Sequence, residues 1–153
     1  MNGRGANVRL LLRIGSEFAC VGPLGAAVRA ASAQLGLESE AAAEVELSVV
    51  EAVNNSIEHA YRLSGDGVVE VLLEALAPGV RIEVRDRGHA MSCGVLERAG
   101  PLEFDAAHVP SLPEGGMGLF IVKQLMDEVH YETSGSLNVL TMVRLGSRAG
   151  RSR

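Results

Sequence analysis

The pattern of apolar and polar residues predicts a strand followed by two helices in the first part of the chain. An apolar run interrupted by arginines over residues 8–14 is typical of a strand. The Ala-rich stretch over residues 23–34 favours a helix that ends near Gly36. Residues 39–62 contain almost no helix breakers and are rich in Ala, Val, Leu and Glu, so they predict a long central helix.

A hairpin is expected after the central helix. Two apolar-rich segments, residues 68–76 and 80–85, flank an Ala-Pro-Gly sequence that favours a turn between antiparallel strands. Residues 88–116 then lose clear periodicity and contain several prolines, which in a small domain indicates a functional loop. One more helix and two strands are expected at residues 118–128, 129–133 and 139–145.

Composition and charge limit the possible partners. The chain has 153 residues and a net charge of −5, so we expect one domain over residues 1–146 and a flexible basic tail over 147–153. The negative charge argues against a nucleic-acid-binding surface. The apolar run near the start is too short for a signal peptide or a membrane span. With 2 cysteines in no metal-binding spacing, a cytoplasmic protein with protein or small-molecule partners is expected.

The central helix has a polar face that could be functional. A helical wheel places Glu44, Ser48, Glu51, Asn55, Glu58 and His59 on one side, opposite Ala42, Val49, Val53, Ile57 and Ala60. Many such faces are simply solvated. Glu51 and Asn55 offer an alternative, because one helical turn sets their side chains next to each other. The carboxylate could polarise a hydroxyl, and the amide oxygen suits Mg²⁺.

Asp86 and Gly88 come where the second hairpin strand should end. Both residue types are common in turns, so an ordinary turn is one interpretation. The alternative is a binding site in which the Asp86 carboxylate accepts a hydrogen bond from an exocyclic amine such as that of adenine. Gly88 would then let the backbone approach the ring. These residues alone leave both interpretations open.

A glycine-rich sequence, Gly115-Gly116-Met117-Gly118, directly precedes the apolar helix expected near residue 118. Backbone N–H groups at a helix start favour an anion such as phosphate, and the helix dipole acts in the same direction. A plain linker is the alternative. The sequence is not a Walker loop, because the Lys-Ser/Thr ending is missing.

Together and in this order, the three motifs resemble the ATP-binding fold shared by histidine kinases, type II topoisomerases and chaperones of the heat-shock 90 class. Residues 51–60 resemble the family's N-box, residues 86–90 its Asp-x-Gly box and residues 116–119 its second glycine box. The sequence Glu-Ala-Val-Asn-Asn-Ser-Ile-Glu-His-Ala-Tyr is similar to the corresponding motif of the bacterial anti-sigma factor serine kinases. The resemblance covers roughly residues 8–145.

The resemblance implies a fold and a role for each motif. The fold is an α+β two-layer sandwich, a mixed, mostly antiparallel sheet covered on one face by helices. Glu51 would be the catalytic base for a substrate serine, and Asn55 would coordinate Mg²⁺. Asp86 would bind the adenine amine, supported by Thr141, and residues 90–115 would form a lid. The implied ATP-binding residues are Asn55, Asp86, Gly88, Ala90, Gly116, Met117, Gly118, Leu119 and Thr141.

The resemblance also implies a regulatory circuit. The protein would hold a sigma factor and release it when an anti-sigma factor antagonist, a STAS-domain protein, competes. Phosphorylation of the antagonist on serine would restore the block, since a phosphoserine brings about −2 charge into an acidic interface. A homodimer through the sheet side away from the nucleotide is implied, with no nucleic acid or membrane as partner.

Two features depart from the family pattern. Residues 101–118 contain no Lys or Arg, whereas relatives often place a basic residue near the γ-phosphate. Leu140 occupies the place where a glycine often precedes the threonine. Two other functions therefore stay open: a nucleotide-gated binding module without catalysis, and a detached histidine-kinase catalytic domain.

Overall fold

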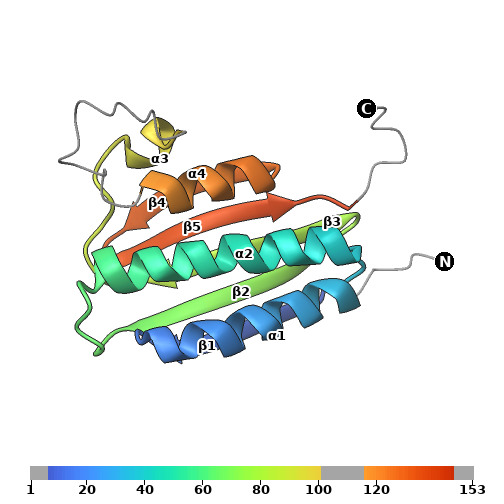
Figure 1. Cartoon of the computed structure of the whole chain (residues 1–153), viewed down its shortest axis with the longest axis horizontal. Helices are drawn as coiled ribbons and strands as arrows, with labels where there is room; N and C mark the ends of the chain where they lie inside the picture. Colours follow the sequence, from blue (N-terminus) through green and yellow to red (C-terminus); the bar gives the residue numbers. More distant parts are fainter. Residues whose placement is uncertain (1–6, 101–115, 147–153) are drawn as a thin grey trace, which may run out of the picture.

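Five strands form one sheet, and the helices lie together on one of its faces (Figure 1). The structure, a computed structural model, describes residues 7–100 and 116–146. The strands are β1 (Arg9–Gly15), β2 (Val68–Leu76), β3 (Gly79–Asp86), β4 (Glu128–Ser134) and β5 (Leu137–Arg144). The helices are α1 (Val21–Gln34), α2 (Ser39–Asn55), the short α3 (Val95–Arg98) and α4 (Gly116–Leu125), with a 3₁₀ turn at Phe18–Cys20.

The sheet confirms the predicted fold class. Its strand order is β1-β2-β3-β5-β4, and every pairing among the described residues is antiparallel, so the parallel component of a mixed sheet does not occur there. The predicted hairpin joins β2 to β3, with Leu76 opposite Gly79. Gly79 has φ +117, and a Cβ at this position would lie 2.3 Å from the Arg144 carbonyl oxygen. A glycine is therefore required where this turn meets β5.

The core lies between the sheet and α2. Alternate residues of β2 and β3 point toward the helices, as the period-2 pattern requires, and six of them are almost or fully buried: Val69, Val71, Leu73, Val80, Ile82 and Val84. The apolar face predicted for α2 packs on them, with Val49 and Val53 fully buried. None of the helices in the described ranges is long and apolar enough to span a membrane.

The prediction that Ser48 belongs to a polar face of the central helix is wrong in part, because its side chain is fully buried at 0% exposure. Helix α4 lies beside α2 (Figure 1) and covers this side of it. The Ser48 hydroxyl has no hydrogen-bond partner among the described residues. The helical wheel could not show this, since it carries no information on which second helix packs alongside.

The central helix does not run uniformly to residue 62. Its α-helical part ends at Asn55, and one π-helical turn, Ser56–Ala60, continues it. Arg62 and Leu63 follow with φ of 50 and 63, a left-handed conformation that is uncommon for such residues. Single π-turns within helices are frequent at functional sites, so the end of α2 is a place to look for function.

The C-terminal elements are shifted from their predicted bounds. Helix α4 spans Gly116–Leu125, so it starts earlier and ends earlier than the expected 118–128. The chain enters β4 at Glu128, because the Asp127 N–H already donates to the Val143 carbonyl oxygen of β5 at 2.8 Å. The long segment predicted to be irregular contains the short helix α3. Residues 101–115 of the expected lid and the expected tail at 147–153 lie outside the described residues.

Candidate functional site

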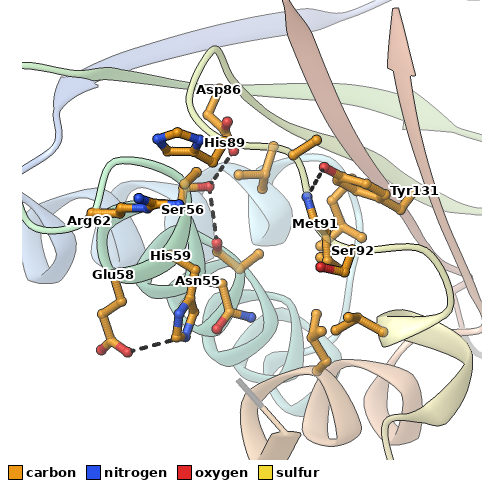
Figure 2. Close-up of a pocket in the computed structure, with 17 residues that line it drawn as sticks. Asn55, Ser56, Glu58, His59, Arg62, Asp86, His89, Met91, Ser92 and Tyr131 are labelled. Carbon is orange, nitrogen blue, oxygen red and sulfur yellow. Dashed lines mark hydrogen bonds and ion pairs between the residues drawn. The ribbon is translucent and has the colours of Figure 1, made fainter. Parts of the chain in front are cut away.

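A cavity of about 440 Å³ opens at the end of α2, between the π-helical turn, the segment after β3 and the start of α4 (Figure 2). Its lining includes Asn55 and Ser56 from the helix, Asp86 from β3, and Leu119 from α4. Three motifs far apart in the sequence thus contribute to one cavity, as the resemblance implied.

Asp86 is held in one orientation at the wall of this cavity. Its Oδ1 accepts hydrogen bonds from the Gly88 N–H at 3.0 Å and from the Asn138 Nδ2 at 2.8 Å. Its Oδ2 accepts one from the Ser56 hydroxyl at 2.9 Å (Figure 2). A carboxylate offers about four lone-pair sites, so one acceptor site stays available on Oδ2. Asp86 can therefore accept one further N–H from a ligand in the cavity.

The side chain that supports Asp86 from β5 is Asn138, and not Thr141 as expected. Asn138 lies directly opposite Asp86 in the β3–β5 register and is 3% exposed. Thr141 lies opposite Glu83, and successive strand residues point to opposite faces of a sheet. The cavity is lined by Leu140 on this strand, so Thr141 points to the other face. This corrects the expected role of Thr141 in nucleotide binding.

Gly88 is required by packing of the chain against the helix end. A Cβ at Gly88 would lie 2.4 Å from the Ala60 carbonyl oxygen, which also accepts a hydrogen bond from the His89 N–H at 2.8 Å. Tyr61 adds a second attachment, since its hydroxyl accepts from the Arg87 N–H at 2.9 Å. The segment after β3 is therefore fixed to the end of α2, with Ala90 lining the cavity just beyond it.

Asn55 carries an unsatisfied donor at the cavity. Its Nδ2 is buried and has no hydrogen-bond partner among the described residues. Figure 2 shows the Asn55 amide at the cavity on the helix side. A buried unpaired amide costs about 1–3 kcal/mol, and a phosphate oxygen would satisfy its N–H while the amide oxygen faces a cation. The N–H and the oxygen of the Asn55 amide thus fit a nucleotide that binds together with Mg²⁺.

The described residues form no cage of side chains around a metal ion. Among the described residues, no group of three or more His, Cys, Asp or Glu could hold a metal ion. Mg²⁺ is commonly held by one or two protein ligands together with substrate phosphates and water. Asn55 alone therefore fits a cation that arrives with a nucleotide.

Glu51 lies against the glycine-led start of α4. A Cβ on Gly118 would lie 2.6 Å from the Glu51 Oε2, so a larger residue there would displace this carboxylate from its position. Glu51 is not part of the cavity lining, which begins one residue later at Ala52. Of the expected glycine-box residues, Gly116 begins α4 and Leu119 is buried and lines the cavity, whereas Met117 is exposed to solvent and is not part of the lining. The structure thus brings Glu51 and the glycine box together.

Tyr131 is a cavity residue that sequence reasoning missed. Its hydroxyl accepts a hydrogen bond from the Met91 N–H at 2.8 Å (Figure 2), which fixes the segment opposite α2. Burial raises the pKa of Tyr131 above its usual value, and the nearby Asp86 charge adds to this. The hydroxyl therefore stays neutral. Tyr131 lies opposite Leu140 in the β4–β5 register, which the sequence alone does not show.

The cationic side chains near the cavity are few. Arg62 is the one Arg or Lys in the described lining, at the end of the cavity beyond the π-helical turn. Lys123 of α4 is occupied: its Nζ donates to the carbonyl oxygens of Leu96, Glu97 and Ala99, at 3.0, 3.3 and 3.1 Å. Lys123 therefore holds α3 against α4 and is not free to contact a phosphate.

The fold, the constrained aspartate and the helix-borne amide define a class of protein, the ATPase domains built on one antiparallel sheet with helices on one face. The model of the histidine kinase-like ATPase domain family matches residues 16–144. The chain belongs to this family.

Similar proteins agree with this assignment. The serine-protein kinase RsbW of Staphylococcus aureus, strains JH9 and Newman, is 34% identical to the chain over 95 residues. The matched region is 60% of this chain and 59% of that protein, so the chain spans less than two thirds of these curated relatives. The resemblance to the serine kinases among the family is thereby confirmed.

Two solved structures share the fold. The RsbU and RsbW domains of Rv1364c from Mycobacterium tuberculosis match with a TM-score of 0.62 and 19% identity, covering 94% of this chain and 34% of that chain. The histidine kinase domain of the blue-light activated kinase EL346 from Erythrobacter litoralis matches with a TM-score of 0.54 and 18% identity, covering 86% and 61%.

Proposed function

We propose that this chain is an ATP-dependent serine/threonine protein kinase that also acts as an anti-sigma factor. The observation that carries the proposal is the alignment of three groups along one side of the structure. Asp86 has one open acceptor site, and Asn55 has an unpaired amide donor at the same cavity. Glu51 lies one helical turn before Asn55 on α2 and is next to Gly118 at the start of α4. The adenine ring, the phosphates and the hydroxyl of the substrate serine would lie in that order next to Asp86, Asn55 and Glu51.

Each group has a defined task in the proposed reaction. Asp86 accepts the 6-amino N–H of adenine and orients the nucleotide. Asn55 would hold Mg²⁺ through its amide oxygen, and the cation would supply charge stabilisation for the transferred phosphoryl group. The Glu51 carboxylate accepts the proton of the partner's serine hydroxyl. The serine oxygen forms a bond to the γ-phosphorus, the bond from the γ-phosphorus to the β-phosphate oxygen breaks, and ADP leaves.

The start of α4 supports phosphate binding. Its first backbone N–H groups have no partner within the helix, and the positive end of the helix dipole favours an anion there. Gly118 brings this helix end next to Glu51. Ala90 and Leu119 line the same cavity as Asp86 and Asn55.

The partners are proposed from the similarity to RsbW. They are a sigma factor and a STAS-domain antagonist, in the cytoplasm, with a homodimer formed through the sheet face opposite the helices. A phosphoserine carries about −2 charge, and next to Glu51 and Glu58 it would be repelled. Release of the phosphorylated antagonist then needs no further conformational change.

A second candidate is a nucleotide-gated binding module with little catalysis. The supporting observation is that Lys123 is occupied by three carbonyl oxygens, while Arg62 lies at the end of the cavity away from α4. Transition-state charge would then depend on Mg²⁺ and backbone N–H groups alone.

Phosphotransfer distinguishes these two functions. The purified chain is mixed with Mg²⁺, γ-labelled ATP and candidate STAS-domain proteins, beside the variants Glu51→Gln and Asn55→Ala. Label on a partner serine that both variants abolish would establish the kinase. ATP binding without transfer to any candidate would favour the binding module. Glu51→Gln keeps the shape of the side chain, so a loss of transfer with unchanged ATP affinity reports its role as a base.

A further inference from the structure

Helix α3 is a single turn that needs other elements to hold it in place. It spans only Val95–Arg98, follows Gly94 without a side-chain cap, and is too short to be stable without tertiary contacts. The last carbonyl oxygens of a helix have no partner within that helix. The position of α3 in the fold therefore depends on groups from other parts of the chain.

Lys123 of α4 supplies partners for these carbonyl oxygens. Its Nζ donates to Leu96, Glu97 and Ala99 at the end of α3, at 3.0, 3.3 and 3.1 Å. Figure 1 shows α3 lying against α4. A positive charge at the C-terminal end of a helix also interacts favourably with the helix dipole. Leu96, which is 9% exposed and belongs to the core, is a second anchor of α3.

The residue type at position 123 fits this task. Lys123 is the only lysine of the chain, and the other strongly basic side chains are all arginines. An ammonium group has three donors that diverge toward separate acceptors, whereas a guanidinium group presents its donors in one plane. Three carbonyl oxygens around one nitrogen therefore suit a lysine better than an arginine.

Helix α3 also forms part of the wall of the cavity. Its first residue, Val95, lines the cavity together with Met91 and Ser92 just before it. The Met91 end of this segment is fixed, because its N–H donates to the Tyr131 hydroxyl at 2.8 Å. Lys123 itself is not part of the lining. This part of the wall is therefore held at one end by Tyr131 and, through α3, at the other end by Lys123.

We propose that Lys123 is a positioning residue for the nucleotide, which acts by fixing α3 and thereby the Val95 part of the cavity wall. The inference rests on the proposed nucleotide binding but not on phosphotransfer. Without the ammonium group, α3 stays in place in only a fraction of the molecules, and the apparent affinity for the nucleotide falls by that fraction. Lys123 has no contact with the nucleotide in this role, because all three of its donors are used by α3.

Titration with the fluorescent nucleotide mant-ADP and Mg²⁺ tests the proposal. Lys123→Met removes the three donors and keeps a side chain of similar length. A single hydrogen bond to a charged group already corresponds to about tenfold in an equilibrium constant. The variant should therefore bind mant-ADP at least about tenfold more weakly. Gln124→Met changes the next, exposed residue of α4 to the same side chain and should bind as the unmodified chain does.

A second substitution shows whether Lys123 acts through α3. Val95→Ala removes part of a side chain that lines the cavity and should weaken mant-ADP binding at least about threefold in the unmodified chain. In Lys123→Met, where α3 is already released, the same substitution should have almost no further effect. Fully additive effects would show that Lys123 acts by another route and would overturn the inference.

Hydrogen–deuterium exchange locates the effect. Without nucleotide, the amides of residues 95–99 should exchange faster in Lys123→Met than in the unmodified chain, while β2 and β3 exchange equally in both. Equal exchange in the strands also shows that the variant is folded. Equal affinity for mant-ADP in the two proteins, or unchanged exchange in α3, would overturn this inference alone. Absence of mant-ADP binding to the unmodified chain would overturn the proposed function together with it.

Discussion

Replacement of Asn138 by alanine should weaken discrimination between adenine and a purine that lacks the 6-amino group. Asn138 donates to the Asp86 Oδ1 at 2.8 Å and to the Gly88 carbonyl oxygen at 3.0 Å. Without these bonds the carboxylate can turn about its Cβ–Cγ bond. The acceptor site on Oδ2 would then no longer be fixed toward the cavity.

The size of the effect follows from the hydrogen bonds involved. A hydrogen bond to a charged group contributes about 1.5–3 kcal/mol, which corresponds to about 10- to 150-fold in Kd. The chain should therefore bind ATP more tightly than purine riboside triphosphate by a factor in that range. In Asn138→Ala we expect the ratio to fall at least about fivefold, with a loss of about 1–3 kcal/mol in the free energy of unfolding.

Calorimetric titration of both nucleotides, in the presence of Mg²⁺, measures the ratio directly. Thr141→Val is the matched control, because Thr141 lies three residues further along β5 and points to the opposite face. Its ratio should equal that of the unmodified chain. If Asn138→Ala weakened both nucleotides by the same factor, Asn138 would have a structural role only, and the reasoning about Asp86 would be refuted.

Three further substitutions test other contacts of the site. Gly118→Ala places a Cβ 2.6 Å from the Glu51 Oε2, so the displaced carboxylate should slow phosphotransfer about 10- to 100-fold while ATP affinity stays nearly constant; a normal rate would contradict the proximity. Gly88→Ala places a Cβ 2.4 Å from a helix-end carbonyl oxygen and should lower the free energy of unfolding by about 1–3 kcal/mol in urea titrations; an unchanged value would show that this segment yields easily. Tyr131→Phe leaves the Met91 N–H unpaired and should cost about 1–2 kcal/mol at pH 8. Because the pKa of Tyr131 is raised on folding, its contribution is complete below about pH 10 and declines above it, so urea titrations at pH 10.5 should show a smaller difference between the two proteins; a constant difference would contradict the assigned shift.

The sheet and its helices were predictable because their signals are local. The turn between β2 and β3 has Pro and Gly at the chain reversal, and the core face of α2 repeats at helical spacing through Val49, Val53 and Ile57. The π-helical turn after Asn55 has no comparable signal. It depends on the packing of residues 86–89 against the helix end.

The site was predictable only in part, because its motifs are local but its supporting contacts are not. Glu51, Asn55 and Asp86 belong to recognisable motifs. The partner of Asp86 on β5 depends on the register between two strands that are about fifty residues apart in the sequence, and a shift of one residue reverses the faces. Thr141 has a side chain that could hydrogen-bond to Asp86, but it points to the other face of the sheet. Asn138 lies directly opposite Asp86 in the β3–β5 register and points to the same face as Asp86.

The central claim, that the cavity binds ATP through Asp86, is tested most directly by titrating Mg²⁺·ATP into the unmodified chain and into Asp86→Asn. The variant keeps the shape of the side chain but replaces one acceptor oxygen by a donor. The account predicts one saturable site in the unmodified chain and a loss of at least about tenfold in affinity in the variant. Equal affinity in the two proteins, or no ATP binding in either, would contradict it.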